Sequence, residues 1–166
     1  MVSRRNFLRN ASLGLSVATF SPLLNKSEGF DFNDKPARND LPVGIADYTF
    51  LNFDIPTSIK MMQRVDIHYM SIKDFHLPLN STKEKIDEVV NEYKEGGITI
   101  YAVGVIYMKS KEAVDQAFEY AKNVGVNMIV GVPNHDLIDY TEQKVKSYNI
   151  KLAIHNHGPE DKMYPN

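Results

Sequence analysis

The sequence predicts an α/β fold of the (β/α)8 TIM-barrel type, of which about five β/α units are present. From residue 41 onward, nearly continuous apolar stretches alternate with amphipathic ones, and each pair takes roughly 25 to 30 residues. Polar side chains gather where the apolar stretches end. Apolar strands separated by amphipathic helices indicate a parallel sheet that is covered by helices.

The first predicted strand covers residues 43–50, and the second covers residues 69–75. Between them, apolar side chains recur about one helical turn apart, which predicts a helix. These apolar positions are Ile55, Ile59, Met62 and Val65.

The helix predicted over residues 81–95 has the clearest start and stop signals. Ser81 and Glu84 fit a capping box, in which a hydroxyl and a carboxylate satisfy free amides at the helix start. Gly96 and Gly97 are predicted to end the helix, because glycine accepts the left-handed conformation.

The second half of the chain continues the alternation of predicted strands and helices. A long β-branched and aromatic run indicates the third strand, and a short, almost fully apolar run indicates the fourth. The predicted elements are a strand over 98–107, a helix over 110–123, a strand over 127–132, a helix over 137–148 and a strand over 150–157.

Two architectures fit this order of elements: an open doubly wound sheet and a (β/α)8 barrel. No Gly-x-Gly-x-x-Gly motif follows any predicted strand, and the sequence contains no phosphate-binding loop. Their absence disfavours a nucleotide-binding open sheet and favours the barrel.

Composition excludes several classes of partner and site. The 166 residues carry a formal net charge of -2, so there is no basic excess to hold nucleic acid. The chain has no cysteine, which excludes a disulfide scaffold and a cysteine-zinc site.

The N-terminus resembles a twin-arginine export signal. Ser3, the pair Arg4-Arg5 and Phe7-Leu8 match that consensus, and the weakly apolar stretch that follows is shorter than the ~20 residues of a membrane-spanning helix. A basic amphipathic helix is the alternative. We expect the export machinery to recognise residues 1–40, a signal and linker, and residues 41–166 to form the barrel domain.

The expected location of the protein is the periplasm. No clear small-x-small cleavage site follows the apolar stretch, so both cleavage and anchoring by an uncleaved signal stay open.

Polar residues at the predicted strand ends are the candidate site residues, because the active sites of TIM barrels lie at the C-terminal ends of the strands. Tyr48 follows the first strand, and Lys73 and His76 end the second. Lys73 could anchor an anion or polarise a carbonyl, or it could pair with Asp74. His135 follows the fourth strand, where capping or solvent exposure is the alternative to a role in binding.

The fifth strand carries the most specific signal. Alternation places His155 and His157 on one face, about 7 Å apart along the strand, pointing into the barrel mouth. Two imidazoles on one face can bind a single metal ion, and nitrogen ligands suit zinc or cobalt better than magnesium. A hydrogen-bonded or merely exposed pair of histidines is the alternative.

Three segments resemble the sugar phosphate isomerase/epimerase family, the xylose isomerase-like barrels. These segments are 71–78, 104–107 and 152–158, and the resemblance spans about residues 41–162. It implies a complete (β/α)8 barrel, a divalent metal (manganese, cobalt, zinc or magnesium) and proton transfer next to a carbonyl of a sugar or polyol. Lys73 and His76 would then be catalytic, Tyr48 and His135 would bind substrate, and His155 stands where many members have a metal-binding Glu.

A closed barrel usually takes about 250 residues, and the remaining family ligands would lie beyond His157. We therefore expect a barrel that is incomplete at its C-terminus and has impaired activity. A periplasmic lyase or hydrolase of oxidised sugars and a non-catalytic sugar-binding module are the alternatives. The sequence indicates neither the substrate nor the oligomeric state.

Overall fold

The structure is a computed structural model that describes residues 41–164. The predicted signal and linker, residues 1–40, lie outside the described residues. The strands are β1 Gly44–Ala46, β2 Tyr69–Ile72, β3 Thr99–Met108, β4 Met128–Pro133 and β5 Lys151–Ile154. The helices are α2 Ile55–Arg64, α3 Lys83–Glu95, α4 Lys111–Val124 and α5 Ile138–Tyr148, with short 3-10 helices η1 Asp47–Phe50 and η2 His135–Leu137.

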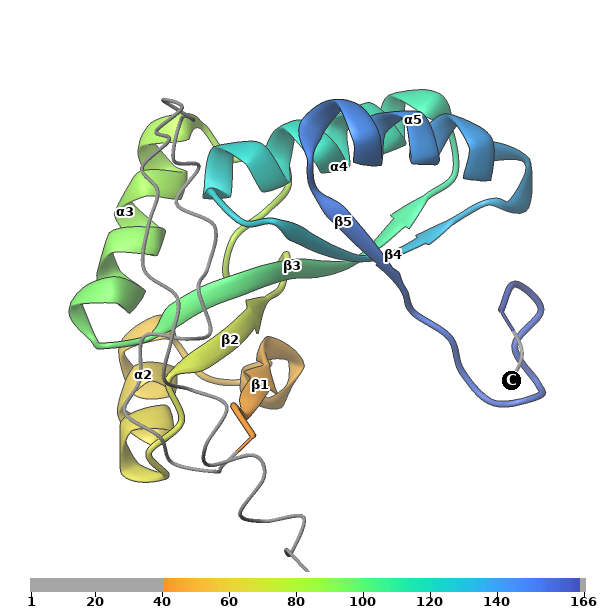
Figure 1. The fold of residues 1–166 in the computed structure, drawn as a ribbon. Coiled ribbons are helices and arrows are strands. Elements are labelled where there is room, and N and C mark those ends of the chain that lie inside the picture. Colours follow the sequence, from red (N-terminus) through yellow and green to blue (C-terminus); the bar gives the residue numbers. More distant parts are fainter. Residues whose placement is uncertain (1–40, 165–166) are drawn as a thin grey trace, which may run out of the picture.

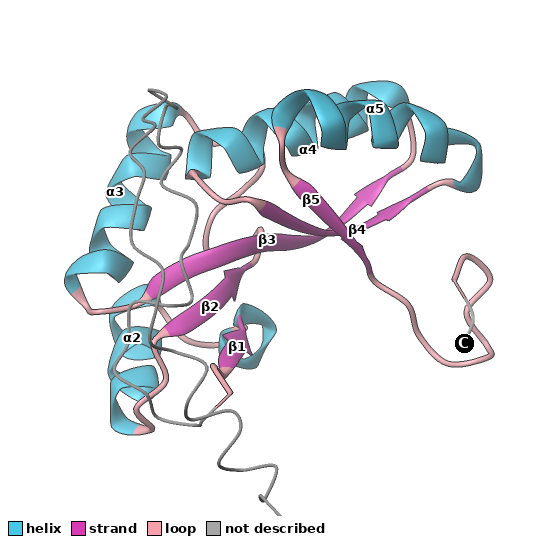
Figure 2. Ribbon diagram, in the orientation of Figure 1, coloured by secondary structure: helices cyan, strands magenta, loops and turns pink. Residues whose placement is uncertain are grey.

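The five strands form one parallel sheet in the order β1-β2-β3-β4-β5, so each strand pairs with the next one along the chain. Right-handed crossovers in an order that never reverses place every connecting helix on the same side of the sheet. Figure 1 shows α2 to α5 along one side of the curved sheet, and Figure 2 shows η1 and the loop that follows β5 on the other. This topology is of the barrel type and excludes the doubly wound alternative for residues 41–164.

The core lies between the sheet and the helices. Met70 and Ile72 of β2 are fully buried. They belong to a continuous apolar cluster that includes the apolar stripes of α3 and α4, namely Ile86, Val89, Tyr93, Val114, Ala117, Phe118 and Ala121. The sequence patterns that predicted amphipathic helices are therefore confirmed.

The capping residue of α3 differs from the prediction by one position. Thr82, not Ser81, is the N-cap, and its hydroxyl accepts a hydrogen bond from the Lys85 amide at 3.3 Å. The predicted end of the helix is confirmed, because Gly96 is the C-cap of α3 and Gly97, the next residue, adopts φ +77°.

Three predicted strands are too long. Residues 47–50 form η1, and residues 73–75 and 155–157 lie beyond β2 and β5. Past Ala46, the Asp47 carboxylate accepts the Lys73 amide at 2.9 Å, so a side chain replaces the strand-to-strand hydrogen bonding there. At the ends of β1 and β2, a polar side chain competes for a backbone group, which shortens both strands.

A bulge in β3 depends on Gly104. The β3–β4 register shifts between Gly104 and Ile106, and Gly104 has φ +129°. A Cβ atom at this position would lie 2.1 Å from the Val130 carbonyl oxygen, so only glycine fits.

Within residues 41–164, no helix is both long and apolar enough to cross a membrane.

Candidate functional site

Five of the predicted site residues fall, together with polar residues that were not predicted, into two groups at the C-terminal ends of the strands. Asp47, Lys73 and His76 follow β1 and β2, and we call them the β1–β2 group. His135, His155 and His157 follow β4 and β5, and with Asp161 and Tyr164 they form the β4–β5 group. Strand β3 separates the two groups within the sheet.

Asp47 is the centre of the β1–β2 group and was not predicted as a site residue. It is only 1% exposed, and its Oδ1 lies 2.7 Å from the Nδ1 atom of His76. Burial raises the pKa of the Asp47 carboxyl above its usual value. The Lys73 amide and the His76 ring favour the ionised form and oppose that rise without cancelling it.

His76 has protein partners at both ring nitrogens. Its Nε2 lies 2.8 Å from the Phe53 carbonyl oxygen, which only accepts, so Nε2 carries a hydrogen. Its Nδ1 faces the Asp47 carboxylate and also the Tyr93 hydroxyl at 3.3 Å. Nδ1 therefore either donates a hydrogen bond to Asp47 or accepts one from a neighbouring hydroxyl group.

The surroundings of His76 hold its ring in place. Its side chain is 7% exposed, and burial raises the pKa of the Tyr93 hydroxyl, which stays protonated at neutral pH. The ring also meets the Phe75 ring edge-on, with centroids 4.6 Å apart. A ligand could reach His76 only by displacing one of these contacts.

Lys73 lies beside this pair with its side chain 20% exposed. Its Nζ donates to the Val105 carbonyl oxygen at 3.3 Å and lies 3.4 Å from a carboxylate oxygen of Asp74. This carbonyl group lies in the β3 bulge that begins at Gly104. An ammonium group has three hydrogens, so Lys73 can still reach a further acceptor.

Tyr48 is 65% exposed, next in sequence to the buried Asp47. Its position after β1 agrees with the order of elements, although it belongs to η1 rather than to a strand.

His155 and His157 come together, but not as alternation along a strand predicted. Because β5 ends at Ile154, both histidines lie in the segment beyond it. Their Nε2 atoms are 2.8 Å apart, and their rings are nearly perpendicular with centroids separated by 4.5 Å. The two ring nitrogens therefore face each other directly, at a distance shorter than the ~7 Å spacing of alternate residues along a strand.

Asp161 holds the other nitrogen of His157. Its Oδ2 lies 2.6 Å from His157 Nδ1, and its Oδ1 accepts the amides of Met163 and Tyr164 at 2.7 and 3.2 Å. These amide hydrogen bonds, followed by His157, keep the pKa of the Asp161 carboxyl below its usual value.

Two converging imidazole nitrogens fit a metal ion as a partial ligand set. Tetrahedral zinc with Zn–N bonds of about 2.0 to 2.1 Å places two nitrogens about 3.3 Å apart. The pair would therefore need to open by about half an ångström, and the rings would need to turn so that both nitrogens point at the ion. No group of three or more His, Cys, Asp or Glu side chains in residues 41–164 is placed to hold a metal. Water or substrate oxygens would have to supply further ligands.

His135 is exposed and fixes the segment that follows β5. Its Nε2 donates to the Met163 carbonyl oxygen at 2.6 Å, and its ring meets that of Tyr164 edge-on with centroids 4.9 Å apart. The Tyr164 hydroxyl in turn donates to the Pro133 carbonyl oxygen at 2.7 Å. The segment beyond β5 is thereby attached to the end of β4.

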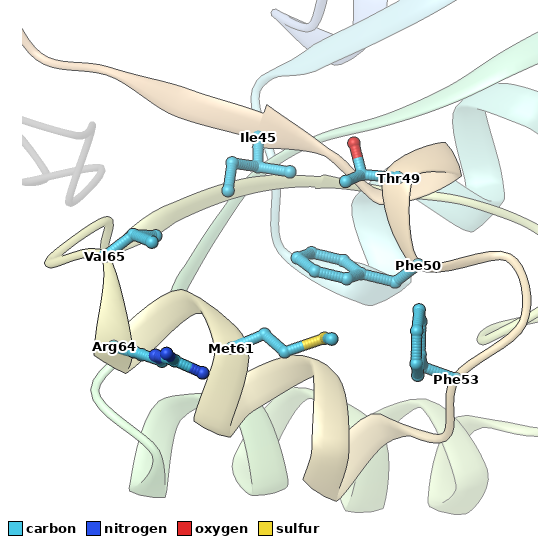
Figure 3. A pocket seen from close by; sticks show the side chains of 7 residues that line it. All are labelled: Ile45, Thr49, Phe50, Phe53, Met61, Arg64 and Val65. Carbon is cyan, nitrogen blue, oxygen red and sulfur yellow. The ribbon is translucent and has the colours of Figure 1, made fainter.

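An apolar pocket of about 500 Å³ lies apart from the histidine pair, between β1, η1 and α2 (Figure 3). The rings of Phe50 and Phe53 and the side chain of Met61 line it in that view. The Phe53 carbonyl also binds His76, so one wall of the pocket is attached to the β1–β2 group.

Comparison with solved structures identifies the fold. An uncharacterized protein from Parabacteroides distasonis aligns with 70% of this chain at 26% identity and a TM-score of 0.64. A xylose isomerase domain containing protein from Salmonella typhimurium covers 70% of the chain at 14% identity and a TM-score of 0.52. A xylose isomerase domain protein from Alicyclobacillus acidocaldarius covers 74% at 9% identity and a TM-score of 0.53.

The fold is part of a xylose isomerase-like TIM barrel. The chain spans about half the length of these solved proteins, matching 53%, 50% and 52% of them respectively. No protein-family model matches the sequence, and no curated protein matches it. The predicted fold class is thus confirmed, and the activity stays a prediction.

Proposed function

We propose that the chain contributes to a sugar isomerase or epimerase type of active site, in which His155 and His157 bind a divalent metal. The observation that carries this proposal is the convergence of their Nε2 atoms at 2.8 Å just beyond β5, at the edge of the sheet where barrel enzymes bind substrate. Nitrogen ligands favour zinc or cobalt over magnesium, while manganese is a weaker candidate. When bound, such a metal stabilises the negative charge that develops as a proton leaves a carbon next to a carbonyl.

In this proposal the β1–β2 group binds an oxygen of the substrate and transfers a proton. Lys73 donates a hydrogen bond to a carbonyl or other oxygen of the substrate, and His76 with Asp47 exchanges a proton. The raised pKa of Asp47 supports this role, because it brings the carboxyl closer to the pH at which proton exchange is efficient. The exposed ring of Tyr48 and the imidazole of His135 contact the sugar.

A non-catalytic sugar-binding module is the second candidate. Two observations favour it: His76 is engaged by the protein at both nitrogens, and residues 41–164 supply no third metal-binding side chain to the pair. A lyase or hydrolase of oxidised sugars would use the same site. The twin-arginine-like leader supports a periplasmic location for each of these functions.

Cobalt titration tests the metal site. We expect the full chain to bind one Co²⁺ with a change in its visible absorption, and His155→Ala and His157→Ala each to abolish that binding. His68→Ala is the matched control, because His68 lies before β2 and bonds Gly97 and Asp66 instead. The metal proposal fails if the chain takes up no stoichiometric metal or if the double variant still binds it.

Deuterium exchange then separates an enzyme from a binding module. With Co²⁺ or Mn²⁺ and a panel of aldoses and ketoses in D₂O, an isomerase-type site exchanges the proton next to the carbonyl, which proton NMR detects. The rate of exchange should fall by about 100-fold or more in Lys73→Ala, because one polarising or proton-transferring group usually contributes at least that factor to the rate. Binding of a sugar without exchange would favour the binding module.

A further inference from the structure

The Asp161 carboxylate bridges the metal-binding candidate His157 and the backbone of its own turn. One oxygen lies 2.6 Å from His157 Nδ1, and the other accepts the amides of Met163 and Tyr164. We propose that Asp161 is a positioning residue, which fixes the ring orientation and tautomer of His157 so that its Nε2 lone pair faces His155. This inference rests on the proposed function, because it assigns a role within the same metal site.

The tautomer follows from the chemistry of the contact. A carboxylate only accepts hydrogen bonds, so it places the ring hydrogen of a neutral His157 on Nδ1. The Nε2 atom then carries a lone pair, which points at His155 Nε2 at 2.8 Å. In the absence of metal, His155 donates its Nε2 hydrogen to that lone pair. For both Nε2 atoms to bind a metal ion, His155 would have to carry its ring hydrogen on Nδ1 instead.

Asp161 is itself held firmly enough to act in this way. The two amide hydrogen bonds fix the carboxylate plane. The hydroxyl of Tyr164 donates to Pro133 at the end of β4, and its ring packs against His135. A continuous set of contacts therefore connects the end of β4 to the orientation of His157, and a carboxylate behind a ligating histidine raises its basicity as a ligand.

Asp161 could instead serve only to shape the turn at residues 161–164. Asp161→Asn separates the two roles, because an asparagine keeps an oxygen for the two amides and has the same size. It loses the negative charge, and its amide group favours a histidine tautomer with the hydrogen on Nε2. Glu160→Gln is the matched control, since it removes one charge from the adjacent, exposed position.

Two measurements on the full chain test the inference. Long-range ¹H–¹⁵N NMR of the metal-free protein should show His157 with its hydrogen on Nδ1 in the wild type and in Glu160→Gln, and on Nε2 in Asp161→Asn. Cobalt titration should show affinity about 10- to 100-fold lower in Asp161→Asn, the usual effect of losing such a partner. Glu160→Gln should bind as the wild type does.

The outcomes distinguish this inference from the proposed function. If the wild type binds no cobalt, the metal proposal fails, while the NMR tautomer still decides whether Asp161 positions His157. If the wild type binds cobalt and Asp161→Asn keeps both the affinity and the Nδ1–H tautomer, Asp161 only shapes the turn. If cobalt affinity fell equally in Asp161→Asn and Glu160→Gln, the cause would be the loss of one negative charge near the site. That result would also overturn the inference.

Discussion

At the scale of single residues, the buried pair of Asp47 and His76 is the most constrained part of the candidate site. Asp47 is inaccessible to water, and it still accepts hydrogen bonds from the Lys73 amide and faces the His76 ring. Charges in such a position are retained only when hydrogen bonds and opposite charges compensate for lost hydration. These contacts do not fully compensate for the lost hydration, so the pKa of Asp47 stays raised.

That raised pKa predicts a pH dependence of stability. The folded state binds the Asp47 proton more tightly than the unfolded state does, so the contribution of this group is fully present below its unfolded pKa. It is lost as the pH rises through the folded pKa. Compared with Asp47→Asn, we expect the wild type to lose free energy of unfolding as the pH rises from about 4.

Urea denaturation of both proteins at a series of pH values measures this difference. If the free energy of unfolding depended on pH in the same way in the wild type and in Asp47→Asn, burial would not raise the pKa of the Asp47 carboxyl. His68→Ala serves as a comparison, because His68 bonds an exposed aspartate instead of a buried one.

The residue scale also marks the limit of sequence reasoning about the site. The positions of Lys73, His76, His155 and His157 beyond the strand ends could be predicted, because polar residues that follow apolar strands are conspicuous. Asp47 could have been noticed by the same signal, since it directly follows a predicted apolar run. Its contact with His76 could not, because it joins positions 29 residues apart whose distance depends on the exact end of each strand.

At the scale of elements, the order of strands and helices was predictable, and their ends were less so. The observed strand ends differ from the predicted ones near Asp47, Lys73 and the histidines beyond β5, which bind backbone or side-chain groups. The periodicity of apolar residues does not indicate such contacts. The bulge in β3 was equally hidden, because Gly104 sits within an otherwise regular β-branched and aromatic run.

Gly104→Ala tests the bulge. The added methyl group would meet the Val130 carbonyl and would occupy a backbone conformation that alanine rarely adopts, so we expect a loss of more than about 2 kcal/mol of stability. Gly97→Ala is the control, because its φ is also positive but no atom lies within 4 Å of the added carbon. That variant should lose only about 1 kcal/mol. Equal losses in thermal or urea unfolding would contradict the steric argument.

At the scale of the whole molecule, exposed apolar side chains concentrate near β1. Ten large apolar side chains are exposed among residues 41–164, and seven of them lie between Leu41 and Val65. These are Leu41, Val43, Tyr48, Leu51, Phe53, Met61 and Val65. Several line or border the pocket of Figure 3, beside the edge strand of the sheet. Apolar surface of this kind next to an open strand edge promotes association.

We therefore expect Met61→Glu and Val65→Lys to reduce self-association of the chain and its binding of a hydrophobic dye. Ile138→Lys is the control, because Ile138 is similarly exposed but begins α5, away from β1. Light scattering across a concentration series measures the association. If the control reduces association as much as the pocket variants do, the surface near β1 has no special role.

The unbroken strand order also bears on how the sheet can be assembled during synthesis. Gly44 of β1 pairs with Tyr69 of β2, and Tyr69 pairs with Thr99 of β3, so each strand finds its neighbour within one β/α unit. A ribosome that releases the chain from its N-terminus therefore delivers every new strand next to one already in place. Among the five described strands, the sheet can grow in the direction of translation, because each strand pairs with the strand made just before it.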